Sequence, residues 1–226
     1  MSLLEEHKAE RRARIQKAAA ELVTRRGYAG LTMRELAQVA RVAVPTLYNL
    51  FGSKDAILVA ELEAQAVRIA ERLPAGGDSF FQRGMAAFEM GMQLVETAPD
   101  LYRAVMHMFL TSPESAHMRR RLEEGYIAIM AMNLTAAKAA GQLAAWAAPD
   151  TVARHMFAQY MAAFLAWGVG ELDTPSFRLA ALSGLCHILA GPARGPFAEE
   201  VEAKLFWLAS QAPPAKEVHR ATSDRR

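Results

Sequence analysis

The residues best suited to chemistry gather between positions 31 and 54, in the stretch LTMRELAQVARVAVPTLYNLFGSK. Thr46 and Tyr48 carry hydroxyl groups that can hydrogen-bond to phosphate oxygens. Their neighbours Val44 and Pro45 can contact only a thymine methyl group or the shape of a groove. This combination favours binding to a nucleic-acid duplex over catalysis.

Signatures of catalysis and metal binding are missing from the rest of the sequence. The six histidines show no His-x-x-x-His spacing, and Cys186 and His187 are adjacent, so on a helix they point about 100° apart. Ser183 and Gly184 lack the preceding glycine of a G-x-S-x-G nucleophile elbow. We therefore expect no enzyme, with no catalytic residue, no metal ligand and no cofactor.

Basic residues are concentrated near the N-terminus. Residues 1–54 hold ten Lys and Arg against five Asp and Glu, a net charge of +5, whereas the whole chain carries only +2. The remaining residues are therefore mildly acidic, at −3. This division indicates that only the N-terminal region meets a polyanion.

Helical spacing predicts an all-α protein, because no stretch alternates with period two and no Asn-Gly or Asp-Gly hairpin signal occurs. Gly27 is placed to end a first helix, and Thr32 with Glu35 forms a capping box for a short second one. Ser53 is placed to cap a fourth helix. The two short helices and the tight turn between them predict a helix-turn-helix over residues 32–51.

A Pro- and Gly-rich stretch at 73–77 predicts a boundary before a larger helical part. Thr174 and Pro175 are expected as the N-cap and first residue of one of its helices. We expect helices over about 79–97, 100–110, 114–145, 150–168, 174–190 and 197–210. The chain then has nine or ten helices, followed by a disordered tail over 212–226.

Nothing in the sequence indicates export or a membrane. A single cysteine, Cys186, cannot form an intramolecular disulfide, and the charged first residues lack the apolar core of a signal peptide. The apolar stretches 128–149 and 161–170 are interrupted or too short to span a bilayer. We therefore expect a cytoplasmic protein without a membrane partner.

Methionine and phenylalanine are frequent after residue 80, at helical spacing. Such side chains adapt to irregular apolar ligands, although plain core packing explains the same stripes. We expect a lipophilic small molecule as a partner, oriented by a few polar groups. The candidate ligand contacts are Phe81, Met85, Phe88, Met92, Met106, His107, Tyr126, Met130, Asn133, Phe157 and Tyr160.

Residues 9–69 resemble the DNA-binding domain of the tetracycline-repressor (TetR) family of bacterial regulators. The matching residues are Arg14-Ile15, Ala18-Ala19, Gly27-Tyr28, Leu31-Thr32, Leu36-Ala37, Val42, Pro45-Thr46-Leu47-Tyr48, Phe51 and Ser53-Lys54. The resemblance implies a regulator, in the expected form a repressor, that binds a palindromic DNA operator as a homodimer and is released by a small-molecule effector. It also implies two domains, with DNA binding at 9–69 and ligand binding with dimerisation at 78–211.

The resemblance implies that Arg34 approaches a base and that Tyr48 and Lys54 contact the phosphate backbone. The full set of implied DNA contacts is Thr32, Arg34, Val44, Pro45, Thr46, Tyr48, Asn49, Ser53 and Lys54. This sequence departs from the family pattern at Arg41 (the turn glycine), Ala43 (the polar cap), Val44 and Leu50. From these departures we predict weaker or more shape-dependent base recognition.

A dimer is also expected on physical grounds, because one helix-turn-helix unit buries only roughly 600–1,000 Å² on DNA. The helices over about 150–167 and 175–190 are the candidates for its interface, with packing inside one chain as the alternative. The candidate contacts are Phe157, Met161, Phe164, Ala180, Ser183, Gly184 and His187.

Two other functions stay open at this level. The departures at Ala43, Val44 and Leu50 are compatible with a helical small-molecule-binding protein whose helix-turn-helix no longer binds DNA. An enzyme is the third alternative. Salt-dependent DNA binding would distinguish the regulator from the small-molecule-binding protein. Turnover of a bound ligand would identify an enzyme.

Overall fold

The computed structural model describes residues 3–72, 79–111 and 115–211. The boundary expected at 73–77 and the tail expected over 212–226 lie outside these ranges. The described residues form ten α-helices and no strand, which confirms the all-α prediction. The helices are α1 (Leu3–Arg26), α2 (Met33–Ala40), α3 (Val44–Phe51), α4 (Lys54–Arg72), α5 (Phe80–Thr97), α6 (Pro99–Thr111), α7 (Ala116–Ala139), α8 (Pro149–Gly168), α9 (Thr174–Ala190) and α10 (Pro196–Gln211).

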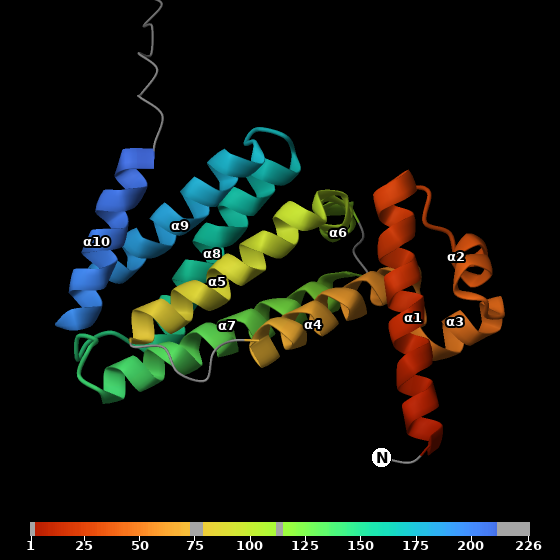
Figure 1. Cartoon of the computed structure of the whole chain (residues 1–226), viewed down its shortest axis with the longest axis horizontal. Helices are drawn as coiled ribbons and strands as arrows, with labels where there is room; N and C mark the ends of the chain where they lie inside the picture. The colour runs from red at the N-terminus through yellow and green to blue at the C-terminus, as the bar shows by residue number, and fades with distance from the viewer. Residues whose placement is uncertain (1–2, 73–78, 112–114, 212–226) are drawn as a thin grey trace, which may run out of the picture.

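The N-terminal helices pack around a small apolar core. Helix α1 crosses the end of the molecule, and α2 and α3 lie on its outer side, away from α5–α10 (Figure 1). Ile15 of α1, Leu36 of α2, Leu47 of α3 and Leu58 of α4 are fully buried. Because each short helix contributes an apolar face to this core, neither α2 nor α3 depends on its own helix propensity for stability.

The C-terminal helices form a bundle in which α8 packs against both α7 and α9. Phe164 and Trp167 of α8 and Phe177 of α9 are buried and contact one another, with ring centroids 5.5–5.9 Å apart. Helix α6 lies between this bundle and α1 (Figure 1), so one continuous core runs from the N-terminal helices into the bundle.

Two helix boundaries differ from the sequence-based prediction. Helix α7 ends at Ala139 and not near 145, because Gly141 takes a left-handed conformation (φ 73°) that terminates the helical hydrogen bonding. Helix α9 is capped by Asp173, whose carboxylate accepts a 2.8 Å hydrogen bond from the backbone N–H of Ser176. The expected cap, Thr174, is therefore the first residue inside the helix.

Cys186 of α9 is buried in an apolar cluster formed by several helices, and this burial raises the pKa of its thiol to about 11. A thiol in this state is protonated and unreactive at neutral pH. Among the described helices, none combines the length and the apolar character that crossing a bilayer requires.

Candidate nucleic-acid interface and ligand cavity

The helix-turn-helix is present, with its helix starts capped as predicted. The backbone N–H of Glu35 donates to Thr32 Oγ1 (3.2 Å), and that of Ala56 donates to Ser53 Oγ (3.1 Å). The capping box is only half formed, since the Glu35 carboxylate instead accepts a hydrogen bond from the Arg26 guanidinium. Glu35 therefore ties α2 to the end of α1.

The turn between α2 and α3 is left-handed at Arg41, with φ 53° and ψ 52°. The backbone N–H of Val42 donates to the Ala37 carbonyl (3.0 Å), and that of Arg41 donates to the Gln38 carbonyl (3.3 Å). This is the Schellman arrangement that glycine usually supplies. An arginine there costs roughly 1–2 kcal/mol in backbone strain, so the turn geometry is kept at the expense of stability.

Replacing Arg41 with glycine is expected to stabilise the helix-turn-helix by about 1 kcal/mol, because glycine adopts φ 53° without a Cβ clash. Urea unfolding followed by circular dichroism measures the change as a higher midpoint at unchanged slope. Gln38→Gly, on the exposed face of α2, serves as the control and should lose about 1 kcal/mol. A midpoint for Arg41→Gly at or below that of the native chain would contradict the strain argument.

Helix α3 presents a face of mixed polarity to solvent. Pro45, Tyr48 and Asn49 are exposed, and Tyr48 leaves 53% of its surface accessible. Val44 and Thr46 are half-buried, and the N-cap position, Ala43, makes no side-chain hydrogen bond. The exposed residues of α3, together with Thr32 and Arg34 at the start of α2, form the surface expected to meet DNA.

Two arginines of α1 hold α2 and α3 in place. Arg12 Nη1 donates to the carbonyl of Leu50 (2.5 Å), and its guanidinium lies 4.1 Å from the centroid of the Phe51 ring. Arg14 Nε donates to the carbonyl of Ala40 (3.2 Å). Both arginines satisfy carbonyls at helix C-termini, so part of the basic N-terminal charge positions the interface.

Lys54 is half-buried, with its ammonium group 4.1 Å from the centroid of the Tyr28 ring. The Tyr28 hydroxyl donates to Asp55 (2.5 Å), and burial together with this bond raises the pKa of Tyr28. The centroid of the Tyr28 ring also lies 5.7 Å from the centroid of the His107 ring on α6. Tyr28 therefore joins the start of α4 to α6.

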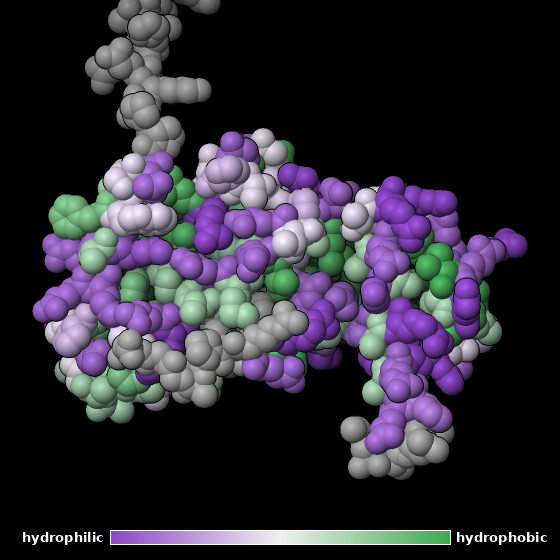
Figure 2. Space-filling view, viewed as in Figure 1, coloured by the Kyte–Doolittle hydropathy of each residue, from purple (hydrophilic) through white to green (hydrophobic). Residues whose placement is uncertain are grey.

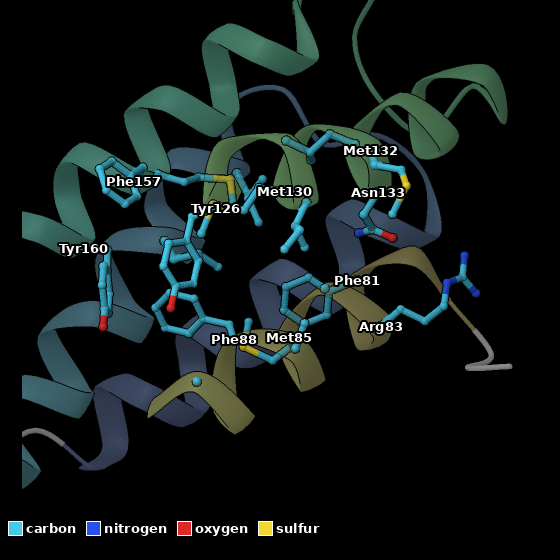
Figure 3. A pocket seen from close by; sticks show the side chains of 18 of the residues that line it. Phe81, Arg83, Met85, Phe88, Tyr126, Met130, Met132, Asn133, Phe157 and Tyr160 are labelled. Carbon is cyan, nitrogen blue, oxygen red and sulfur yellow. The ribbon is translucent and has the colours of Figure 1, made fainter. Parts of the chain in front are cut away.

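A cavity of about 390 Å³ lies among helices α5–α10. Figure 3 shows aromatic and methionine side chains from α5, α7 and α8 pointing into it. Of the candidate ligand contacts, the structure brings nine to its wall: Phe81, Met85, Phe88, Met92, Tyr126, Met130, Asn133, Phe157 and Tyr160. These residues come from three separate helices, so only the packing of α5, α7 and α8 makes them one site.

Two candidate ligand contacts do not line the cavity. Met106 is buried against Gly168 of α8, and His107 is exposed and contacts Tyr28. Only the beginning of α6 reaches the cavity, through Tyr102. The next turn of α6 does not line the cavity. The prediction that Met106 and His107 contact the ligand is therefore corrected.

Sequence reasoning missed several residues of the cavity wall, among them Tyr102, Arg83 and Met132. Tyr102 is buried, whereas Met132 leaves 70% of its surface accessible at the mouth. Arg83 also lies at the mouth, and its guanidinium is 4.5 Å from the centroid of the Phe80 ring. Arg83 lies three residues after Phe80 and four before Ala87, so it shares a helix face with them. This spacing is too weak a signal to predict from the sequence that Arg83 lines the cavity.

Residues 15–60 match the model for bacterial regulatory proteins of the tetR family. That segment contains the second half of α1, all of the helix-turn-helix and the start of α4. This segment of the chain belongs to the TetR family.

Two curated regulators resemble this chain. The HTH-type transcriptional regulator EthR of Mycolicibacterium smegmatis is 28% identical over 150 residues, which cover 63% of this chain and 65% of EthR. The HTH-type transcriptional repressor KstR of the same organism is 34% identical over 112 residues, covering 47% of this chain and 54% of KstR. The chain thus matches less than two thirds of the length of either relative.

Solved structures of TetR-family regulators share the fold. A TetR-family regulator from Rhodococcus sp. superposes with a TM-score of 0.63 at 23% identity, over 81% of this chain and 96% of the other. FadR from Thermus thermophilus, solved in complex with lauroyl-CoA, superposes with a TM-score of 0.65 at 22% identity, over 82% of this chain and 97% of the other. At sequence identities of 22–23%, the similarity shows only that the fold is shared.

The residues expected at a dimer interface of this chain fall into two groups. Phe157 lines the cavity and stacks on Tyr126, and Phe164 is buried in the aromatic cluster, so both side chains contact their own chain. Met161 is half-buried against the same core. By contrast, Ala180, Ser183 and His187 line a groove between α9 and α10, and Gly184 is half-buried against Gln159 of α8.

Proposed function

We propose that this chain is a ligand-responsive transcriptional regulator, a repressor that binds a palindromic DNA operator as a homodimer and releases it when a lipophilic effector binds. One observation carries the proposal: a helix-turn-helix with an exposed second helix and an apolar cavity of about 390 Å³ occur in one continuously packed chain. The family match of residues 15–60 supports the DNA-binding part.

The exposed face of α3 is suited to the major groove. Tyr48 and Asn49 offer hydrogen-bonding groups, and Pro45 at the start of the helix offers an apolar contact. Hydrophilic side chains cover most of α1 in the view of Figure 2, which suits an approach to the charged DNA backbone. In this arrangement phosphate contacts dominate affinity, and few base contacts set specificity.

The homodimer that we propose uses the outward faces of α8 and α9. On α8, Ala158, Ala162, Leu165 and Val169 are exposed and fall at helical spacing on one side. Small residues on that face permit close approach of a second copy, and Leu165 and Val169 add apolar area. Phe157 and Phe164 are left to the interior of each protomer.

A long-chain acyl compound is the effector class that the cavity suits best. Its wall is mainly phenylalanine, methionine and leucine, and it lies between helices of a bundle, where ligand sites commonly occur. The T. thermophilus regulator of the same fold was solved with lauroyl-CoA. We extend that chemistry to this chain as part of the proposal.

A chain of hydrogen bonds offers a route from the cavity to the DNA-binding helices. The hydroxyl of Tyr102, on the cavity wall, donates to Gln65 Oε1 of α4 (2.6 Å). Gln65 Nε2 and Arg68 Nη2 both donate to the buried carboxylate of Glu61, at 3.0 and 2.9 Å. A ligand that displaces Tyr102 thus alters the position of α4, which follows the helix-turn-helix directly.

The proposal is tested by DNA selection from a random pool, followed by a gel shift with the selected duplex at rising salt. We expect steep loss of binding with salt, because Lys and Arg contacts release counterions from DNA. Tyr48→Ala should weaken binding by about fivefold or more, from one lost phosphate hydrogen bond at roughly 1 kcal/mol. Val39→Ala, exposed on α2, serves as a surface control. Absence of duplex binding at low salt, or unchanged affinity in Tyr48→Ala, would refute this role.

Tyr102→Phe is expected to uncouple the two sites. The variant keeps the ring in the cavity wall but loses the 2.6 Å hydrogen bond to Gln65, so the ligand should still bind. The factor by which the ligand weakens operator affinity should fall about fivefold, which corresponds to roughly 1 kcal/mol of coupling free energy. Operator titrations with and without dodecanoate measure that factor. An unchanged factor would show that the Tyr102–Gln65 bond does not transmit the signal.

A further inference from the structure

Three tyrosines gather at one end of the cavity. Tyr126 of α7 and Tyr160 of α8 lie at the end away from Asn133, with their hydroxyl groups pointing in the same direction (Figure 3). Tyr102 of α6 also lines the cavity; burial raises its pKa, and the nearby phenols of Tyr126 and Tyr160 raise it further. Asn133 lies two helical turns beyond Tyr126 on α7, which separates the two ends by about 10 Å.

Two of the three hydroxyl groups can donate a hydrogen bond to a ligand. The Tyr102 hydroxyl donates to Gln65 Oε1 of α4 (2.6 Å), so its proton is already shared with the protein. The hydroxyls of Tyr126 and Tyr160 have no hydrogen-bond partner within the described parts of the chain. Burial raises the pKa of both phenols, so each keeps its proton at neutral pH and can donate it to an acceptor.

The tyrosine end offers no charge that could balance a charged ligand. Behind Tyr102, the buried carboxylate of Glu61 accepts from Gln65 Nε2 (3.0 Å) and from Arg68 Nη2 (2.9 Å). Glu61 and Arg68 therefore balance each other. An anion beside the tyrosines would lie near the Glu61 carboxylate and would lose its hydration without gaining a countercharge, which is unfavourable.

The other end of the cavity directs no charge into it. Arg83 is the one charged residue that lines the cavity within the described part of the chain. Its guanidinium lies 4.5 Å from the centroid of the Phe80 ring and points away from the cavity (Figure 3). Asn133 Nδ2 donates to the carbonyl of Phe80 (2.8 Å), so this amide is also engaged within the protein. An uncharged ligand is therefore the class that the wall fits.

We propose that the cavity takes an uncharged, elongated carbonyl compound whose oxygen accepts hydrogen bonds from the hydroxyls of Tyr126 and Tyr160. A carbonyl oxygen has two lone pairs, so it can accept from both. The alkyl chain then lies along Phe81 and Met130 toward Asn133. The inference narrows the long-chain acyl class to its uncharged members, and it rests on the proposed function only in treating this cavity as the effector site.

Three probes test this assignment by isothermal titration calorimetry without DNA: methyl nonyl ketone, decanoate and decylammonium. The ketone and decanoate share one shape, because a methyl group of the ketone replaces one carboxylate oxygen. We expect the ketone to bind at least about tenfold more tightly than either ion, because each ion loses hydration without gaining a countercharge. Decanoate still binds through its alkyl chain. Binding of either ion as tight as that of the ketone would overturn the proposal.

Matched variants locate the hydrogen bonds. The double variant Tyr126→Phe with Tyr160→Phe keeps both rings in the cavity wall and removes both donors. It should bind methyl nonyl ketone about tenfold more weakly, as the loss of two net hydrogen bonds allows. Tyr102→Phe is the control, because the Tyr102 hydroxyl donates to Gln65, and its ketone affinity should stay unchanged. Unchanged ketone affinity in the double variant, or an equal loss in Tyr102→Phe, would refute the assignment.

The two proposals fail in different ways. If methyl nonyl ketone binds as expected but the chain never binds duplex DNA, the proposed regulator function is wrong and the assignment of the cavity stands. If the chain binds its operator but decanoate or decylammonium binds as tightly as the ketone, the assignment is wrong and the regulator function stands.

Discussion

Replacing Gly91 with leucine is expected to weaken dodecanoate binding by about tenfold to a hundredfold while raising the stability of the chain. Gly91 lies within α5 on the cavity wall, and a Cβ built there meets no atom within 4 Å. A leucine side chain would therefore enter the space that we assign to the ligand, and a ligand forced against it would incur roughly 1–3 kcal/mol of overpacking. Calorimetric titration with dodecanoate measures the loss.

The same substitution should increase the free energy of unfolding by about 1 kcal/mol, because glycine is a poor helix former. Gly125→Leu is the matched control: Gly125 is exposed on α7, and a Cβ there also meets open space, but it does not line the cavity. That variant should gain helix stability and bind dodecanoate normally. In the operator assay, Gly91→Leu should stay bound to DNA when dodecanoate is added. Unchanged dodecanoate affinity in Gly91→Leu would show that the ligand binds elsewhere.

Arg12→Ala is expected to destabilise the helix-turn-helix by about 2–3 kcal/mol. The substitution removes a charge-assisted hydrogen bond to the Leu50 carbonyl (2.5 Å) and a cation–π contact with Phe51 (4.1 Å). It also leaves a carbonyl at the C-terminus of α3 without its partner. Hydrogen exchange of the α3 backbone amides, followed by mass spectrometry, measures the local loss of protection.

Arg11→Ala provides the control for charge. Arg11 is exposed on the same turn of α1, so its removal should change stability by no more than about 0.5 kcal/mol while it lowers the basic charge equally. If the two variants show the same protection of α3, the Arg12–Leu50 bond contributes nothing to the interface. If only Arg12→Ala loses both protection and operator affinity, the arginine acts by positioning α3.

The helix-turn-helix was predictable from the sequence because its signals are local. The caps Thr32 and Ser53 bond to backbone groups three residues away, and Gly27 ends α1 with a left-handed conformation. The departure at Arg41 was also visible in the sequence, and the structure shows that the turn keeps its left-handed conformation with arginine in place of glycine. Periodicity was less informative about the end of α7, where Gly141 terminates a helix that the apolar pattern extends to 145.

The sequence by itself thus determined the helices, their caps and the stripe of methionine and aromatic residues after position 80. Only the tertiary structure decided which of these residues share a cavity, because the rotation of each helix about its axis is set by its packing against distant helices. That packing excludes Met106 and His107 and adds Arg83 and Tyr102. It likewise joins Arg12 to Leu50, which is 38 residues away in the sequence.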